Sequence, residues 1–364
     1  MRVMTVLGTR PEIIRLSLII GKLDRLADRH ILVHTGQNYT ASLNDVFFQE
    51  MGVRKPDHIM AGGSHSLGGQ LSGMFGEMER LLKEERPHVV LLLGDTNSAL
   101  CAIVAERMGI PVVHMEAGNR CYDLTVPEEK NRRIIDAVST INMPYTEYSK
   151  NNLLREGFPA NRIVRTGNPI YEVMSFYRSR IDASDILNRL GLQAGEYLLV
   201  TTHRAENVDV PLHLDGILEG LNRIAERHGK RLICSIHPRT RSRIDSGGTG
   251  VKPHPLVEFH EPFGFFDFVA LERSAWCAVS DSGTVQEECC LLGVPTVTIR
   301  NTTERPETVD CGSNAVSGLK ADNIAAAVDV MTALPASWSI PAGYEATDVS
   351  DIVVKFLLGG KWNV

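Results

Sequence analysis

Two apolar runs that each end near a carboxylate constrain the fold of this chain more than any other feature. Val89–Leu93 is followed by Gly94 and Asp95, and Val112–His114 is followed shortly by Glu116. Unbroken apolar runs of this length, separated by helix-length sequence, are typical of buried parallel strands. In open α/β sheets, ligands bind beyond the carboxyl ends of the strands. The two acids are therefore predicted to mark a binding or catalytic site.

A second pair of acids, Glu128 and Glu129, follows further along the chain and is also expected in a loop. For Asp95 alone, capping of the next helix and catalysis are both open, because aspartate is a common N-cap residue. The combination of several acids at expected loop positions favours a site.

The composition is that of an ordinary globular protein, with 43% hydrophobic and 23% charged residues among 364. This length is sufficient for two domains. The formal net charge of −6 argues against non-specific nucleic-acid binding, although a local basic pocket can still bind an anion.

No apolar run reaches the roughly 18 residues that a membrane helix needs, and the N-terminal apolar run is too short for a signal peptide. The seven cysteines include no CxxC pair, which argues against a zinc ribbon and a thioredoxin motif. We therefore expect a cytoplasmic protein with reduced cysteines and no association with membranes.

Alternating strand and helix patterns predict two Rossmann-like domains, each a doubly wound parallel α/β sheet. Turn residues around Asn168 place the boundary there, which gives an N-terminal domain over 1–168 and a C-terminal domain over 169–345. Residues 346–364 are expected to form a helix that packs back across the domains. Two such domains facing each other form a cleft, which is a favoured ligand site. The expected strands beyond the first two are Val3–Leu7, Ile31–Thr35, Ile141–Pro144, Tyr197–Thr202, Arg231–Ile236, Val257–Phe259, Trp276–Ser280 and Thr296–Ile299.

The turn after the first expected strand reads Gly8-Thr9-Arg10-Pro11-Glu12. It lacks the three spaced glycines of a dinucleotide-binding turn, which disfavours NAD. Arg10 at a helix N-terminus instead suits a phosphate, and Arg15 can add positive charge. The alternative is that Arg10 is a surface residue paired with Glu12.

A similar strand, small-residue turn and helix occur in the second half, around Ser282 and Gly283. The backbone N–H groups of these two residues would face a phosphate at the helix N-terminus, and Glu288 could reach back to ribose hydroxyls. The alternative is a plain helix cap with solvent-facing acids. One such turn in each half implies a ligand that carries a diphosphate.

His203 and His237 each follow an expected strand of the second half. A histidine at a strand end can donate to a phosphate or act as an acid or base, but a structural role is equally open for a single histidine. The spacing of His237, His254 and His260 fits no metal motif.

Several short motifs, none specific by itself, together form a highly specific set. They are Gly8-Thr9-Arg10-Pro11-Glu12, Gly94-Asp95-Thr96, Glu116-Ala117-Gly118, Pro127-Glu128-Glu129 with Asn131-Arg132, Thr202-His203-Arg204, Asp281-Ser282-Gly283 with Gln286-Glu287-Glu288, and Thr303-Glu304-Arg305-Pro306-Glu307. By this set the chain resembles the non-hydrolysing UDP-N-acetylglucosamine 2-epimerase family over nearly its whole length.

The resemblance implies two Rossmann-like domains in the GT-B arrangement, a homodimer, and neither a metal nor a redox cofactor. It implies a UDP-2-acetamido sugar and UDP as ligands, and inversion at C2. In the family reaction UDP is eliminated across C1–C2 to give a glycal and is then added back. Such precursors serve surface polysaccharide synthesis.

By resemblance, the catalytic residues are Asp95, Glu116, Glu128 and His203. Carboxylates suit proton transfer at C2 and stabilise positive charge at C1, and the departing diphosphate needs hydrogen-bond donors. The substrate-binding residues expected from the motifs and from the reasoning above are Arg10, Arg15, Arg132, His237, Ser282, Gly283, Glu288 and Arg305.

The chain departs from the family pattern at three places. After Gly118 it reads Asn119-Arg120-Cys121-Tyr122-Asp123, which resembles the branch that makes UDP-N-acetyl-L-fucosamine from UDP-2-acetamido-2,6-dideoxy-L-talose. Gln37-Asn38-Tyr39 differs from the Gln-His-Arg pattern of members with an allosteric substrate site. Thr284 stands where the phosphate turn usually has a second glycine.

Three functions remain open from the sequence alone. The first is a UDP-sugar C2 epimerase, and the second is a hydrolysing relative that releases free sugar and UDP. The third is a GT-B glycosyltransferase or a catalytically silent UDP-sugar binder. The four proposed catalytic residues are all present, which disfavours the silent binder.

Overall fold

The strongly apolar segments of the N-terminal half form a six-stranded parallel sheet. Its strands are β1 (Arg2–Leu7), β2 (Arg29–His34), β3 (His58–Ile59), β4 (Val89–Leu93), β5 (Val112–Met115) and β6 (Ile141–Met143). Their order is β3-β2-β1-β4-β5-β6, the doubly wound order of dinucleotide-binding folds. The computed structural model describes residues 1–37, 41–61, 66–236, 238–245 and 249–360.

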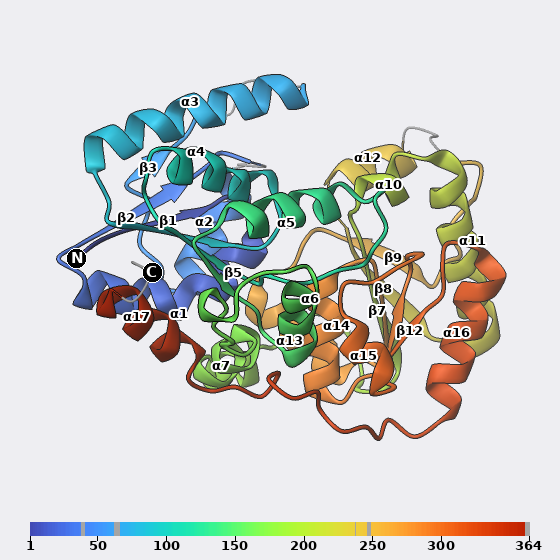
Figure 1. Ribbon diagram of the computed structural model, residues 1–364. Helices are drawn as coiled ribbons and strands as arrows, with labels where there is room; N and C mark the ends of the chain where they lie inside the picture. Colours follow the sequence, from blue (N-terminus) through green and yellow to red (C-terminus); the bar gives the residue numbers. More distant parts are fainter. Residues whose placement is uncertain (38–40, 62–65, 237, 246–248, 361–364) are drawn as a thin grey trace. The chain divides into compact units, whose positions relative to one another are not determined.

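Helices cover both faces of this sheet, in keeping with its central strand β4, in which every residue is apolar and buried. They are α1 (Arg10–Leu26), α2 (Ala41–Glu50), α3 (Leu67–Glu85), α4 (Cys101–Arg107), α5 (Pro127–Val138), α6 (Glu147–Arg155), α7 (Pro169–Phe176) and α17 (Val349–Gly359), with the short 3-10 turns η1 (Asn97–Leu100) and η2 (Ala160–Arg162). On one face, α3 and α4 pack Met78, Leu81 and Ala105 against Val90 and Leu92. On the other face lie α1 and α17 (Figure 1).

The C-terminal half builds a second parallel sheet of the same type. Its strands are β7 (Tyr197–Thr202), β8 (Arg231–Ile236), β9 (Val257–His260), β10 (Cys277–Ser280), β11 (Thr296–Thr298) and β12 (Asn314–Val316). Read from β9, the order β9-β8-β7-β10-β11-β12 repeats the pattern of the first sheet. Each half therefore confirms the predicted doubly wound α/β class.

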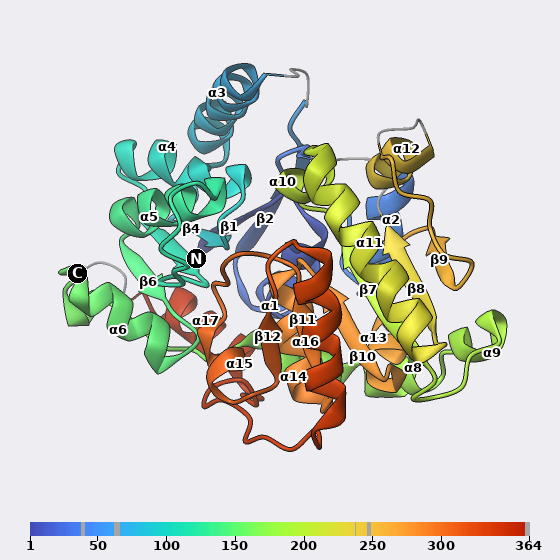
Figure 2. The ribbon, with the colours of Figure 1, turned by 90° about the vertical axis from the view of Figure 1, so that its right-hand side faces the viewer.

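The helices of this second sheet also lie on both faces. They are α8 (Arg178–Asp182), α9 (Ile186–Leu190), α10 (Ala205–Val208), α11 (Pro211–His228), α12 (Pro238–Asp245), α13 (Phe265–Ser274), α14 (Gly283–Leu292), α15 (Pro306–Asp310) and α16 (Ala321–Ala333). Helices α11 and α16 lie side by side on one face, where Ile217 and Ile324 join the core (Figure 2). Helices α13 and α14 lie on the other face.

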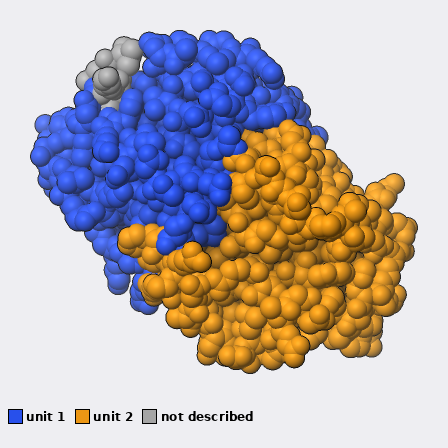
Figure 3. Space-filling view, turned by 90° about the horizontal axis from the view of Figure 1, so that it is seen from below, with its two compact units in different colours: residues 1–175, 342–364 blue, residues 176–341 orange. Residues whose placement is uncertain are grey.

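The chain divides into two units, residues 1–175 with 342–364 and residues 176–341, which Figure 3 draws in different colours. The chain first passes from one unit to the other after Ser175, near the end of α7, and not at Asn168, where the sequence places the boundary. Asn168 is fully buried and its amide donates to Gly343 O at 2.8 Å, so it belongs to the interior of the first unit.

The C-terminal helix α17 returns to the first unit. Its buried residues Val349, Val353 and Leu357 face α1, and the Ser350 amide donates to Glu172 in α7 at 2.8 Å. The sequence predicts this helix from its apolar spacing, but the helix that it contacts is set only by the tertiary structure.

The strands expected from the sequence omit two short ones. Strands β3 and β12 lie at the edges of their sheets and contain only two and three residues, too few to give a periodic pattern.

We predict that Leu357→Ala lowers the free energy of unfolding by about 2–5 kcal/mol, because Leu357 is fully buried and the change leaves a cavity. Urea denaturation measures this loss. The neighbouring Leu358→Ala is the control, because Leu358 is only partly buried, and a smaller loss is expected. Equal losses would contradict the packing described for α17.

Candidate active site

The carboxyl ends of β4 and β5 bring Asp95 and Glu116 to the same edge of the first sheet. The two strands pair directly, with Leu93 opposite Met115, and the Gly94 amide donates to Met115 O at 3.1 Å. Asp95 and Glu116 thus follow neighbouring strands, as the sequence predicts. This edge lies beside the point between β1 and β4 where the strand order reverses, which is where doubly wound sheets bind their ligands.

Asp95 forms an ion pair with Arg132 from α5. Arg132 is almost completely buried, and it also contacts Glu129 at 2.9 Å. The residue that precedes η1 as its N-cap is Thr96, so Asp95 does not cap the helical segment that follows it. The capping alternative for Asp95 is therefore wrong.

The expectation that Glu128 and Glu129 lie in a loop is also wrong, because both belong to the first turn of α5. Pro127 opens this helix, since its missing N–H is not needed there, and acids in a first turn are stabilised by the helix dipole. Glu129 is fully buried and accepts from the Cys121 amide at 3.0 Å, whereas Glu128 is partly exposed. Glu128 is the acid of this pair that a ligand can reach.

Glu116 forms a buried ion pair with Arg15 from α1. The Arg15 guanidinium also lies over the Tyr145 ring, 5.9 Å from its centroid. Glu116 has a φ of +66°, a conformation that is uncommon for residues other than glycine and concentrates at functional sites. The backbone here holds the carboxylate in one orientation at an energetic cost.

A buried charge network lies below these two acids. His114 contacts Asp136 through Nδ1 at 2.8 Å and the Gly94 carbonyl through Nε2 at 2.8 Å. Asp136 also pairs with Arg120 at 2.8 Å and accepts from the Gly118 amide at 3.1 Å. Burial raises the pKa of Asp136, but His114 and Arg120 outweigh this effect and lower it below the ordinary value. The network fixes the loops that carry Asp95 and Glu116.

Glu12 is a buried acid at this edge to which the sequence assigns no catalytic role. Its carboxylate accepts from the Gly8 and Thr9 amides at the end of β1 and from Thr96 Oγ1, at 2.8 Å, beyond the end of β4. Burial raises the pKa of Glu12 to about 7, against the opposing effect of these hydrogen bonds. Its position in a capping box, three residues after Thr9, is the signal that could have identified it.

Arg10 does not pair with Glu12, so that alternative is wrong. Its guanidinium lies over the Phe47 ring at 5.5 Å, and burial lowers its pKa. Arg10 therefore stands in the first turn of α1, close to the carboxyl end of β1, where helix amides and a cation favour an anion.

In the second unit, His203 follows β7 and Asp281 follows the adjacent strand β10. The His203 side chain is 52% exposed, and its Nδ1 lies 3.1 Å from Asp281 Oδ1. Asp281 itself is fully buried. The sequence identifies Asp281 only as part of the phosphate turn.

The turn at Ser282 and Gly283 agrees only in part with the expectation that both backbone amides face a phosphate. Ser282 precedes α14 as its N-cap, and Gly283 is the first helical residue. However, the Ser282 amide already donates to Ser280 Oγ at 2.9 Å, so it is engaged within the turn. A Cβ atom on Gly283 would lie 2.8 Å from Glu304 Oε1, so a larger residue would require the Glu304 side chain to shift.

Glu288 and Arg305 are both buried in the second unit, which contradicts the alternative of solvent-facing acids after this turn. Arg305 forms an ion pair with Glu287, the residue before Glu288. Burial and the neighbouring Glu288 carboxylate raise the pKa of the buried Glu272 well above its ordinary value. His237, and Asn38 and Tyr39 of the expected allosteric loop, lie outside the described residues.

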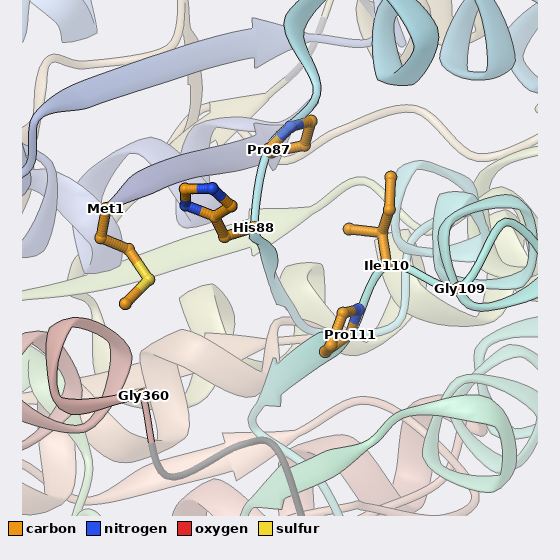
Figure 4. Close-up of a pocket in the computed structure, with 7 residues that line it drawn as sticks. All are labelled: Met1, Pro87, His88, Gly109, Ile110, Pro111 and Gly360. Carbon is orange, nitrogen blue, oxygen red and sulfur yellow. The ribbon is translucent and has the colours of Figure 1, made fainter.

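The other features of the described chain do not add to the candidate site. Among the described residues, no three or more His, Cys, Asp and Glu side chains form a group that could hold a metal ion. In the same residues, no helix combines the length and apolarity needed to cross a membrane. An open hollow of about 390 Å³ is lined by Met1, His88 and Pro111, among others (Figure 4). It lies before β1, β4 and β5 begin, away from the acids.

A family model described as UDP-N-acetylglucosamine 2-epimerase matches residues 22–357. The chain belongs to the UDP-N-acetylglucosamine 2-epimerase family. This confirms the resemblance inferred from the motifs, and it confirms the enzyme class, because members of the family are epimerases.

The similar proteins include enzymes named for different sugars. The UDP-N-acetylglucosamine 2-epimerase of Methanocaldococcus jannaschii is 38% identical over 370 residues, which covers 100% of both chains. The UDP-2,3-diacetamido-2,3-dideoxy-D-glucuronate 2-epimerase of Pseudomonas aeruginosa is 36% identical over 89% of this chain and 90% of that protein.

Solved structures extend the similarity to the fold. The M. jannaschii enzyme in complex with UDP-GlcNAc and UDP gives a TM-score of 0.93 at 37% identity, covering 99% of this chain and 100% of that chain. The Neisseria meningitidis enzyme bound to UDP-GlcNAc gives 0.89 at 28% identity, covering 99% and 100%. The predicted Rossmann-like fold is thereby confirmed.

We predict a pH dependence of stability that arises from Glu12. Its raised pKa, about 7 against an ordinary 4.5, means that the folded chain keeps a proton which the unfolded chain releases. Stability from this group is therefore present below about pH 4.5 and is lost as the pH rises through about 7, by about 3 kcal/mol in all.

Urea denaturation across this pH range measures the effect. Glu12→Gln removes the titrating group, so its free energy of unfolding should lack this part of the slope. Glu79→Gln, on the exposed side of α3, is the control and should keep it. The same slope in wild type and Glu12→Gln would show that folding does not shift the pKa of Glu12 and would contradict the prediction.

Proposed function

We propose that this protein is a UDP-2-acetamido-sugar C2 epimerase that eliminates UDP across C1–C2 to give a glycal and adds it back. The observation that carries the proposal is the pair of carboxylates, Asp95 and Glu116, at the ends of adjacent strands, each paired with a buried arginine. Relatives solved with UDP-GlcNAc and UDP support the nature of the ligand.

The first half of the reaction breaks two bonds. A carboxylate takes the C2 proton, the C–H electrons form the C1–C2 double bond, and the C1–O electrons leave with UDP. In the second half, a proton returns to the opposite face of C2 and UDP adds to C1. Asp95 and Glu116 suit the two proton transfers, and Glu128 suits stabilisation of the positive charge that develops at C1.

The arginines beside these acids have a supporting role in the proposal. Arg132 and Arg15 are both buried and both occupied by carboxylates, so we assign them to the orientation of Asp95 and Glu116. Breaking a buried ion pair would leave an uncompensated charge in the interior. Such a pair therefore holds its two side chains in one arrangement. We therefore propose that Arg132 and Arg15 act on the substrate through these two acids and not by the direct contact that the sequence predicts.

The second unit suits the UDP portion of the substrate. Gly283, at the start of α14, and the exposed His203 provide donors for a diphosphate. In the first unit, Arg10 suits an anionic group of the ligand. Glu288 suits the ribose hydroxyls. Arg305, which is paired with Glu287, suits support of the α14 helix rather than direct contact.

We propose UDP-N-acetylglucosamine as the substrate, with UDP-N-acetylmannosamine as the product. The segment that favours UDP-2-acetamido-2,6-dideoxy-L-talose begins with Asn119 and Arg120, and both are buried in structural contacts. Asn119 Oδ1 accepts from Ser149 Oγ at 2.6 Å, and Arg120 binds Asp136 and Glu156. These contacts support a scaffolding role for the two residues rather than sugar selection.

Identity alone does not fix the sugar, since relatives of similar identity are named for different substrates. A panel of UDP-2-acetamido sugars of the D and L series is therefore the direct test. The family's homodimer, a role in surface polysaccharide synthesis and a cytoplasmic location stay predictions. Light scattering tests the first of them.

We predict that turnover of UDP-N-acetylglucosamine in D₂O places deuterium at C2 of the product, because the mechanism exchanges the C2 proton with a solvent-accessible acid. NMR of the products follows both the label and the sugar. Epimerisation without deuterium at C2 would contradict elimination. Release of free sugar with UDP would identify a hydrolysing enzyme instead.

We predict that Asp95→Asn and Glu116→Gln each lower kcat by about 10²–10⁴-fold while UDP still binds, because general acid–base catalysis contributes about this much. Steady-state kinetics and calorimetry with UDP measure the two quantities. Glu79→Gln, on the exposed side of α3, is the control and should leave both unchanged. A kcat near that of the wild type in both carboxylate variants would contradict the assignment.

A further inference from the structure

Asp281 receives more hydrogen bonds than a turn residue needs. It follows β10, is fully buried, and its Oδ2 accepts from Thr202 Oγ1 at 2.9 Å and from the His203 and Arg204 amides at 3.0 Å each. Asn207 Nδ2 adds a further donor to Oδ2 at 3.0 Å. These contacts hold the chain at the end of β7. Oδ1 also accepts from the His203 amide, at 3.2 Å, and is approached by one side chain.

That side chain is His203, whose Nδ1 lies 3.1 Å from Asp281 Oδ1. A carboxylate only accepts, so this contact requires hydrogen on Nδ1. The imidazole is half exposed while its partner is completely buried, which leaves Nε2 as the ring atom for a ligand. Burial raises the pKa of Asp281, but His203 and Arg204 outweigh burial and keep it well below its usual range.

We propose that Asp281 is a positioning residue that acts through His203: it fixes the imidazole with hydrogen on Nδ1 and stabilises the imidazolium that donates from Nε2 to the diphosphate of UDP. The inference rests on the proposed function, in which His203 contacts the leaving group. Charge-assisted hydrogen bonds are about twice as strong as neutral ones, so the charged ring is the better donor.

Asp281→Asn gives a sharp test because the two carboxylate oxygens have different side-chain partners. Four donors surround Oδ2, so the amide oxygen of asparagine takes that position and its NH₂ group faces Nδ1. Nδ1 must then accept, and hydrogen moves to Nε2 of a neutral ring. The substitution exchanges the tautomer while it keeps the shape of the turn.

Ring ¹⁵N chemical shifts of His203 report this state directly. We expect hydrogen on Nδ1 in the wild type, on both nitrogens with UDP bound, and on Nε2 alone in Asp281→Asn. Thr202→Val is the matched control, because it removes one Oδ2 donor and leaves the contact with His203. It should keep the wild-type ring signature. An unprotonated Nδ1 in the wild type overturns the proposal, whether or not the variant folds.

UDP affinity gives the second measurement. We expect Asp281→Asn to weaken UDP binding about tenfold, in line with the difference between a charged and a neutral donor. The same change in a His203→Ala background should have little further effect, because Asp281 then has no ring to act through. Additive losses in the double variant would mean that Asp281 only supports the fold and would overturn the proposal.

These outcomes separate the inference from the function on which it rests. Ring signatures and UDP affinities do not require epimerisation, whereas the product assay does. An active epimerase whose His203 ring is unchanged by Asp281→Asn would retain the proposed function and lose this inference. A protein with the expected ring signature but no C2 inversion would lose the proposed function.

Discussion

The ion pairs between buried arginines and carboxylates at the carboxyl edge of the first sheet hold the candidate site together. Asp95 and Glu116 follow strands whose side chains are almost entirely buried, so neither acid could remain there as an isolated charge. Arg132 and Arg15 compensate them from α5 and α1. Removing one partner of such a pair costs about 3–5 kcal/mol, so the helices and the strand ends are fixed together.

The second unit meets the same constraint by another means. Its buried acid at the sheet edge, Asp281, is compensated mainly by backbone amides, a hydroxyl and an imidazole rather than by a guanidinium. Backbone amides that face this turn suit a surface that receives an anionic ligand. The two units thus share a strand order but stabilise their acids differently, in keeping with the proton transfer that we propose for the first unit and the nucleotide binding that we propose for the second.

For the segment after β5, the family pattern concerns the choice of sugar, whereas the structure shows which contacts its side chains make. By comparison of patterns, Asn119-Arg120-Cys121-Tyr122-Asp123 resembles a branch that acts on an L-sugar. In the structure, Arg120 and its partners Asp136 and His114 form a buried network that reaches the Gly94 carbonyl. A residue that differs between branches can therefore position the acids without touching the sugar. The identity of Asn119 and Arg120 thus does not by itself decide which sugar is bound.

The sequence by itself determined the fold class, most strands and the family, because apolar period, turn residues and motif spacing are local properties of the chain. It also predicted that Asp95, Glu116 and His203 lie after strands and that Gly283 lies at the start of a helix, since the strands before them are recognisable in the sequence. Only the tertiary structure decided the partners. The pairing of Arg15 with Glu116, of Asp136 with His114 and of Asp281 with His203 joins residues far apart in sequence. The raised pKa of Glu12 likewise depends on burial, which no local pattern encodes.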